Sequence, residues 1–227
     1  FVIPDTTLKP ADGDLRLRAD SGVRAALSLL DQPPFRLLSR AGLPADLAEG
    51  GAQLTGRVRF PLGQGVTPDQ VGYDVTGVLS GLRSERLVPG RVLSSDDLAL
   101  AADPTELSLE GRAALDGVAV TGRFRLPLGP EAGPAEVTAR ATLTPEAAET
   151  FGLRLPPGSL SGAATAELAL TLPRGAAPTL SLTSTLAGLG LRLPGLGWSK
   201  PPGTPGQLQL DGRLGFRGAP PAFDTVA

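Results

Sequence analysis

The feature that most constrains this sequence is a two-residue alternation of apolar and polar side chains that recurs along most of the chain. In one such run, Leu54, Val58 and Phe60 alternate with threonine and arginine. Side chains that alternate in this way lie on opposite faces of a β-strand. Similar runs begin near residues 15, 71, 118, 164, 180, 189 and 208, and Gly, Pro and Asp separate them. The sequence therefore predicts a mainly β protein.

The strands are expected to form an antiparallel sheet. One apolar and one polar face are typical of antiparallel strands, because buried parallel strands are apolar on both faces. Asp116 and Gly117, between two apolar runs, predict a two-residue hairpin turn. A sheet with so much aliphatic surface must cover that face or offer it to a ligand. We expect a long curved antiparallel sheet that forms an open hydrophobic groove, with two short helices.

The two helices are predicted from apolar spacing and from capping residues. The first spans residues 21–30, with Ser21 as its N-cap. The second begins after Thr144, with Pro145 in its first turn and Glu146 as an acidic residue close to its N-terminus. Both helices follow a predicted strand and precede a turn that contains Gly-Leu.

This shared order indicates an internal duplication. Setting Gly50 on Gly162 aligns the strand that follows each glycine, together with the proline that ends the strand. We therefore predict one continuous segment, residues 1–227, that contains two repeat units of approximately 12–120 and 121–227.

The composition excludes most catalytic chemistry. The chain has no histidine and no cysteine, so it has no Ser-His-Asp triad, no thiol nucleophile and no usual zinc, haem or iron–sulfur site. Adjacent Asp96 and Asp97 are interpreted as a polar turn, and Glu146 and Glu149 as partners of a helix dipole. We expect no cofactor, no metal and no enzymatic activity.

Charge argues against a nucleic-acid partner. The chain has 21 basic and 23 acidic residues, without the positive excess that phosphate backbones attract. The single tryptophan, Trp198, is predicted to fill a turn beside the core, with anchoring at an interface as the alternative. Several arginines recur on polar strand faces and are interpreted as a solvated surface, with contact to a lipid phosphate as the alternative: Arg16, Arg18, Arg57, Arg59, Arg123 and Arg125.

Several segments resemble a known family. Residues 186–201, LAGLGLRLPGLGWSKP, resemble a stretch of the AsmA-like proteins of the YhdP type. Residues 31–34 with 40–44, and residues 88–91, are similar to the helix and turns of that family, and the resemblance extends over about 15–216. The chain begins with Phe1 and contains no methionine, so we expect a piece of a longer protein.

The resemblance implies a segment of a repeating β-groove protein on the periplasmic face of the Gram-negative inner membrane. It implies anchoring by an N-terminal helix outside this sequence, and passage of phospholipids between the inner and outer membranes, in support of outer-membrane integrity. The implied partners are phospholipid acyl chains, with the membrane itself contacted through other parts of the parent chain. The family supplies no catalytic residues.

The candidate site is the apolar face of the strands, where aliphatic side chains line the expected groove. An alternative is a structural or interaction β-sandwich module of a cell-envelope protein, in which the apolar faces close on each other. A third possibility, an enzyme, requires a convergent carboxylate pair in a pocket. The predicted lining residues are Leu54, Val58, Phe60, Val71, Tyr73, Val75, Leu79, Val118, Val120, Phe124, Leu126, Leu168, Leu170, Leu172, Leu180, Leu182 and Leu186.

Overall fold

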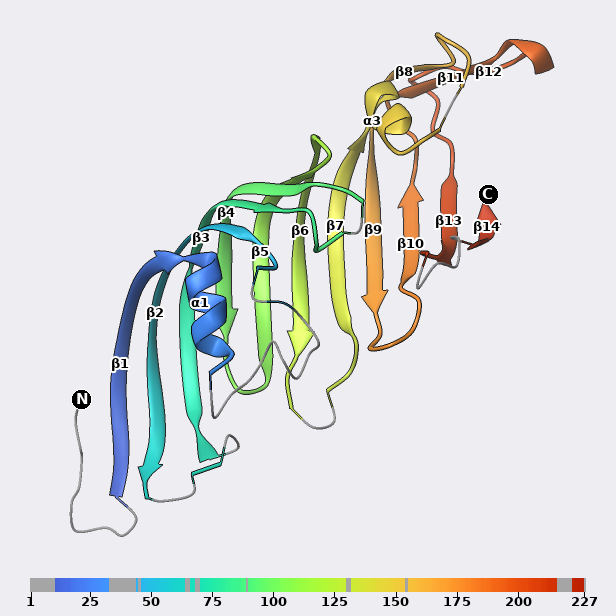
Figure 1. Ribbon diagram of the computed structural model, residues 1–227. Helices are drawn as coiled ribbons and strands as arrows, with labels where there is room; N and C mark the ends of the chain where they lie inside the picture. Colours follow the sequence, from blue (N-terminus) through green and yellow to red (C-terminus); the bar gives the residue numbers. More distant parts are fainter. Residues whose placement is uncertain are drawn as a thin grey trace. The chain divides into compact units, whose positions relative to one another are not determined.

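The computed structural model confirms the fold class. It describes residues 11–32, 44, 46–63, 66–67, 70–88, 90–129, 132–153, 155–215 and 222–226. Strands account for 61% of the residues that the structure describes. They form two sheets: an eleven-stranded antiparallel sheet, which does not close into a barrel, and a three-stranded sheet (Figure 1). The described residues also form two short α-helices.

Neighbouring strands of the large sheet follow one another in the chain, except where the chain passes through a strand of the small sheet. Its strands, in spatial order, are β1 (Ala11–Gly22), β2 (Glu49–Leu62), β3 (Gly72–Ser84), β4 (Leu93–Ala102), β5 (Glu106–Leu115), β6 (Val118–Pro127), β7 (Ala135–Leu143), β9 (Ala164–Leu172), β10 (Thr179–Ser184), β13 (Leu208–Arg213) and β14 (Ala222–Val226). The small sheet contains β12 (Trp198–Lys200), β11 (Leu189–Leu193) and β8 (Leu160–Gly162). The helices are α1 (Val23–Leu30), α3 (Pro145–Thr150) and a 3₁₀ turn at Pro194–Leu196.

The chain divides into two compact units. The first comprises Phe1–Leu115 with Arg125–Ala132, and the second comprises Asp116–Phe124 with Gly133–Ala227. In each unit a short helix follows a strand: α1 begins immediately after β1, and α3 begins two residues after the last residue of β7. The predicted duplication, with repeats at 12–120 and 121–227, stays a prediction.

In the first unit, strand pairing continues further than the sequence predicts. β1 and β2 pair without interruption, and Ser21 lies opposite Ala52. Ser21 is therefore part of the strand, and its prediction as an N-cap is wrong, because β1 extends through Gly22 and α1 begins at Val23. The helix buries Val23 in a core cluster that also contains Ala48, Ala52, Leu79, Leu82 and Leu98.

In the second unit, the predicted start of the helix is confirmed. The Thr144 hydroxyl accepts a hydrogen bond from the backbone N–H of Ala147 at 3.1 Å, and Pro145 occupies the first turn. Glu146 is the acidic residue of that turn. Hydrogen bonds from the neighbouring threonine hydroxyl and from backbone at the helix start lower the pKa of Glu146.

The turn at Asp116 and Gly117 is also confirmed, since β5 ends immediately before it and β6 begins immediately after it. Both residues have positive φ angles, 50° and 84°, as a two-residue hairpin of mirror-image turn type requires. By contrast, the interpretation of Asp96 and Asp97 as a turn is wrong. Both are exposed residues within β4, at an irregularity in its pairing with β5.

Candidate functional site: the apolar face of each unit

In the first unit, strand register gathers the alternating apolar residues on one face. Val58 pairs with Leu15 on one side and with Tyr73 on the other. Leu54, which lies on the same face of β2 as Val58, is opposite Gly77. Directly paired side chains of an antiparallel sheet share a face and lie about 5 Å apart at Cβ. These residues therefore form a continuous surface across β1, β2 and β3.

The predicted lining residues of this unit are mostly half-buried. Tyr73 and Val75 retain partial exposure, whereas Val71 and Leu79 are buried at 7% exposure each. Burial raises the pKa of the Tyr73 hydroxyl, and the negative charge of Asp103 adds to this effect. The other partly exposed candidates of this unit are Leu54, Val58, Phe60 and Leu126.

Helix α1 covers only one end of this face. Its Ala26 and Leu27 pack beside the buried cluster, and Leu79 belongs to that cluster. Val58 and Tyr73, near the opposite end of β2 and β3, do not belong to it and remain partly exposed. The helix therefore leaves most of the apolar face of the first unit without a covering element in the described part of the chain.

The second unit has an equivalent arrangement. Leu170 pairs with Val137 and with Leu180, so the three strands β7, β9 and β10 place apolar residues on one face. Leu186 is buried, together with Ala164 and Leu189, where the small sheet packs. The remaining predicted residues of this unit are partly exposed: Val118, Val120, Phe124, Leu168, Leu170, Leu172, Leu180 and Leu182. That they line a lipid groove stays a prediction.

Several glycines of the strands lie opposite large residues and were not predicted from the sequence. Gly77 lies between Leu54 and Leu100, and a Cβ atom placed on it would lie 2.6 Å from Leu54 Cδ2. Leu54 therefore reaches across the neighbouring strand. The same pairing occurs at Gly13–Phe60, Gly56–Val75, Gly111–Leu98 and Gly212–Phe223. These glycines occupy strand positions at which the two-residue alternation places apolar side chains, and this was the sequence pattern that could have predicted them.

The arginines lie on the opposite, polar face, as predicted. Arg57 donates hydrogen bonds to the carboxylate of Asp14, which lowers the pKa of Asp14 and raises the pKa of Arg57. In the second unit, a guanidinium nitrogen of Arg140 lies 3.2 Å from a carboxylate oxygen of Glu167 on the paired strand. The Arg140–Glu167 pair is exposed, so it contributes little to stability, whereas the Asp14 side chain of the other pair is 13% exposed.

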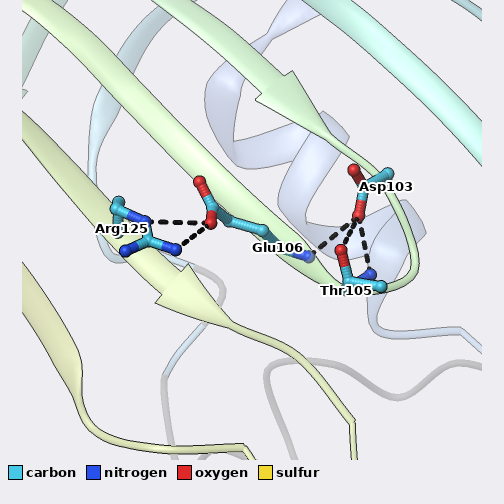
Figure 2. A network of polar contacts seen from close by, with 4 residues as sticks. All are labelled: Asp103, Thr105, Glu106 and Arg125. Carbon is cyan, nitrogen blue, oxygen red and sulfur yellow. Dashed lines mark hydrogen bonds and ion pairs between the residues drawn. The ribbon is translucent and has the colours of Figure 1, made fainter.

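A polar network closes the turn between β4 and β5 (Figure 2). Asp103 accepts hydrogen bonds from the Thr105 hydroxyl at 2.6 Å and from the backbone N–H groups of Thr105 and Glu106 at 2.7 and 2.9 Å. The side chain of Glu106 then accepts two hydrogen bonds from Arg125, at 2.9 and 2.5 Å. The bond from the Thr105 hydroxyl is the main cause that lowers the pKa of Asp103.

This lowered pKa gives the turn a predictable pH dependence. Ionised Asp103 stabilises the fold above the ordinary aspartate pKa of about 3.9, and that contribution is lost as the pH falls through the lowered value. An Asp103→Asn variant should therefore lose stability at neutral pH and unfold with a shallower acid dependence, as measured by urea unfolding from neutral to acid pH. Asp96→Asn, which removes an exposed carboxylate outside this turn, is the control. Equal acid dependence of Asp103→Asn and the unmodified chain would contradict the assignment.

In the small sheet, Trp198 differs from its prediction, and Lys200 has a buried position that was not predicted. Trp198, the first residue of β12, is 49% exposed, so the prediction that it fills a turn beside the core is wrong. Lys200, two residues later, is 7% exposed. Its ammonium donates hydrogen bonds to the backbone carbonyls of Leu186 and Leu189 at 2.9 and 2.6 Å. The sequence carried no signal for a buried lysine.

No family model matches the chain, and neither a curated protein nor a solved structure matches it. Within the described residues, no helix is long and apolar enough to cross a membrane. The same residues contain no cluster of three or more acidic side chains that could hold a metal ion, and the sequence has no histidine or cysteine to contribute.

Proposed function

We propose that the apolar face of each unit holds the acyl chains of phospholipid. The observation that carries this proposal is the partial exposure of the aliphatic residues on one side of the large sheet, such as Val58 and Val75 in the first unit and Leu170 in the second. Among the described residues, α1 covers one end of the face in the first unit, and the small sheet covers one end of the face in the second unit. Exposed apolar surface of this kind marks a ligand or partner site.

The chemistry of these faces suits acyl chains. Removing a methylene group from water stabilises the bound state by about 0.8 kcal/mol, without any specific contact. The aliphatic side chains supply no hydrogen-bond donors, so they favour chains over polar ligands. Strands lie about 4.8 Å apart, so the five strands β1–β5 extend over roughly 19 Å. This is comparable to half of a hydrocarbon core of about 30 Å, the depth that one acyl chain occupies.

The resemblance to AsmA-like proteins of the YhdP type supports a wider role. On that basis the chain is a segment of a conduit on the periplasmic side of the inner membrane. The conduit carries phospholipid between the inner and outer membranes and so maintains the outer membrane. The segment acts by shape and apolarity, without a catalytic group. Anchoring to the membrane then belongs to other parts of the parent protein.

A structural or interaction module without bound lipid is the second candidate. The buried residues Val71, Leu79 and Leu186 favour it locally, because they already belong to dry, packed regions. A sandwich, however, requires a second sheet of similar size against the apolar face. In the described residues the other sheet has three strands, and these pack at one end of the second unit. This arrangement favours lipid binding.

The test is binding of a fluorescent phospholipid, with mass spectrometry of lipid that copurifies. Val75→Asp and Leu170→Asp place a carboxylate on the apolar face and should each reduce binding by about tenfold or more, since a charge resists burial beside an acyl chain. The matched controls, Thr76→Asp and Ala169→Asp, place the same charge on the exposed polar face of the same strands and should bind normally. Absence of copurified lipid and of any binding by the unmodified chain would refute the proposal.

A further inference from the structure

Strand β1 presents a long and regular sheet edge. It pairs with β2 at every position from Ala11 to Gly22, and no strand lies on its other side in the described part of the chain. Its twelve residues contain no proline, and its pairing shows no bulge. The outward backbone N–H and C=O groups of such an edge are a template for a further strand.

The charges of this edge are self-complementary. On the polar face of β1 the order of charged residues is Asp12, Asp14, Arg16, Arg18 and Asp20, so two acids precede two bases and a third acid follows them. We propose that β1 pairs in antiparallel orientation with β1 of a second copy of this chain, about a two-fold axis at Leu15. Asp12 then lies opposite Arg18 of the second copy, and Asp14 lies opposite Arg16 of the second copy. Opposite charges that face each other across strands stabilise the pairing.

No other register in this segment places both arginines opposite acids of the second copy; an axis at Ala19 pairs Arg18 with Asp20 but places Arg16 opposite Gly22. An axis at Asp14 places this residue opposite itself in the second copy, and an axis at Arg16 does the same with two arginines. An axis at Gly13 or Leu17 likewise pairs acid with acid or base with base. Shifting the strands by one residue turns the apolar face of one copy toward the polar face of the other. The pattern of charges therefore selects the axis at Leu15.

The apolar face fits the same axis. Leu15 is 37% exposed in the single chain, and it would lie against Leu15 of the second copy. Leu17 would lie opposite Gly13 of the second copy, as Leu17 already lies opposite Gly56 within the sheet. Leu15 therefore lies opposite the same residue of the second copy, and Leu17 lies opposite a glycine. The apolar faces of the two copies lie on the same side of the joined sheet.

The second copy also compensates a like-charge contact. Arg16 lies directly opposite Arg57 of β2, and Asp14 already binds Arg57. Like charges that face each other across strands are destabilising. A carboxylate from Asp14 of the second copy would give Arg16 a partner of opposite charge. The dimer is isologous, because each copy contributes the same surface. It does not depend on lipid binding.

Charge reversal tests the pairing. Arg16→Asp with Arg18→Asp makes the charged face of the edge wholly acidic, and Asp12→Arg with Asp14→Arg makes all four of its paired charged positions basic. Analytical ultracentrifugation should show a concentration-dependent dimer for the unmodified chain, at least tenfold weaker self-association for each double variant, and a heterodimer when the two are mixed. Dimerisation should weaken with salt. The control, Arg112→Asp with Arg192→Asp, changes the net charge by the same amount as the acidic double variant. Its substitutions lie on exposed residues away from this edge, so it should dimerise normally.

Cross-linking tests the register, and circular dichroism confirms that each variant folds. The chain has no cysteine, so introduced thiols report only on their own positions. Leu15→Cys lies on the proposed axis and should form a disulfide-linked dimer on oxidation. Ala19→Cys, which faces Ala11 of the second copy, should not. The inference fails if the unmodified chain is monomeric throughout the micromolar range, if the mixed charge variants do not associate, or if Ala19→Cys cross-links as readily as Leu15→Cys.

Discussion

Replacing Gly77 with alanine is expected to lower the free energy of unfolding by about 3 kcal/mol, a large effect for a single added methyl group. The Cβ atom would overlap the backbone carbonyl oxygen of Gln53 and would lie 2.6 Å from Leu54 Cδ2. Leu54 could rotate away, but the carbonyl belongs to the paired strand and cannot move without breaking the register of β2 and β3. Strand separation must therefore increase locally.

The same strand provides the control. Gly72 begins β3, and a Cβ atom placed on it would have no neighbour within 4 Å. Gly72→Ala should change stability by less than about 1 kcal/mol, because it changes only the conformational freedom of the unfolded chain. Urea unfolding followed by circular dichroism gives both values. A Leu54→Ala, Gly77→Ala double variant should stay destabilised, since the carbonyl contact remains. Recovery of full stability in that variant would show that only the leucine mattered.

The sequence predicted the faces of the sheet because face assignment is a local property. Period-two alternation places Val58 and Tyr73 on one side of their strands regardless of which strands pair, and the observed register joins them on that side. The cap at Thr144 was predictable for a similar reason, since its hydrogen bond to Ala147 spans three residues. Local chemistry determines both features.

The features that were predicted wrongly or missed depend on distant partners. Ser21 is a good N-cap by itself, but pairing with Ala52 keeps it in the strand. Asp96 and Asp97 look like turn residues, but β4 continues through them with a local irregularity. Alternation also cannot show what covers a face, so the burial of Leu79 under α1 and the exposure of Trp198 follow only from packing.

Lys200 is the clearest case of a residue whose role follows only from its surroundings, and its replacement should have the second large effect. Lys200→Met is expected to destabilise the small sheet by about 3 kcal/mol, because two charge-assisted hydrogen bonds to backbone carbonyls are lost. Those carbonyls belong to Leu186 and Leu189, which are both buried. Methionine fills the same volume and avoids burying an ammonium group, which offsets part of the loss but leaves both carbonyls without this donor.

Lys200→Arg should not restore stability. The lysine stem packs against Gly206, where a Cβ atom would lie 3.0 Å from Lys200 Cε, so the larger guanidinium has no room. Hydrogen exchange should accelerate in β11 and β12, near the lost contacts, and remain slow in β2 and β3 of the first unit. Arg192→Met is the matched control, because Arg192 is an exposed basic residue on β11 and its replacement should be nearly neutral. If Lys200→Met exchanges as slowly as the control in β11 and β12, the buried ammonium does not hold the small sheet in place, and apolar packing around Leu186 and Leu189 is sufficient to do so.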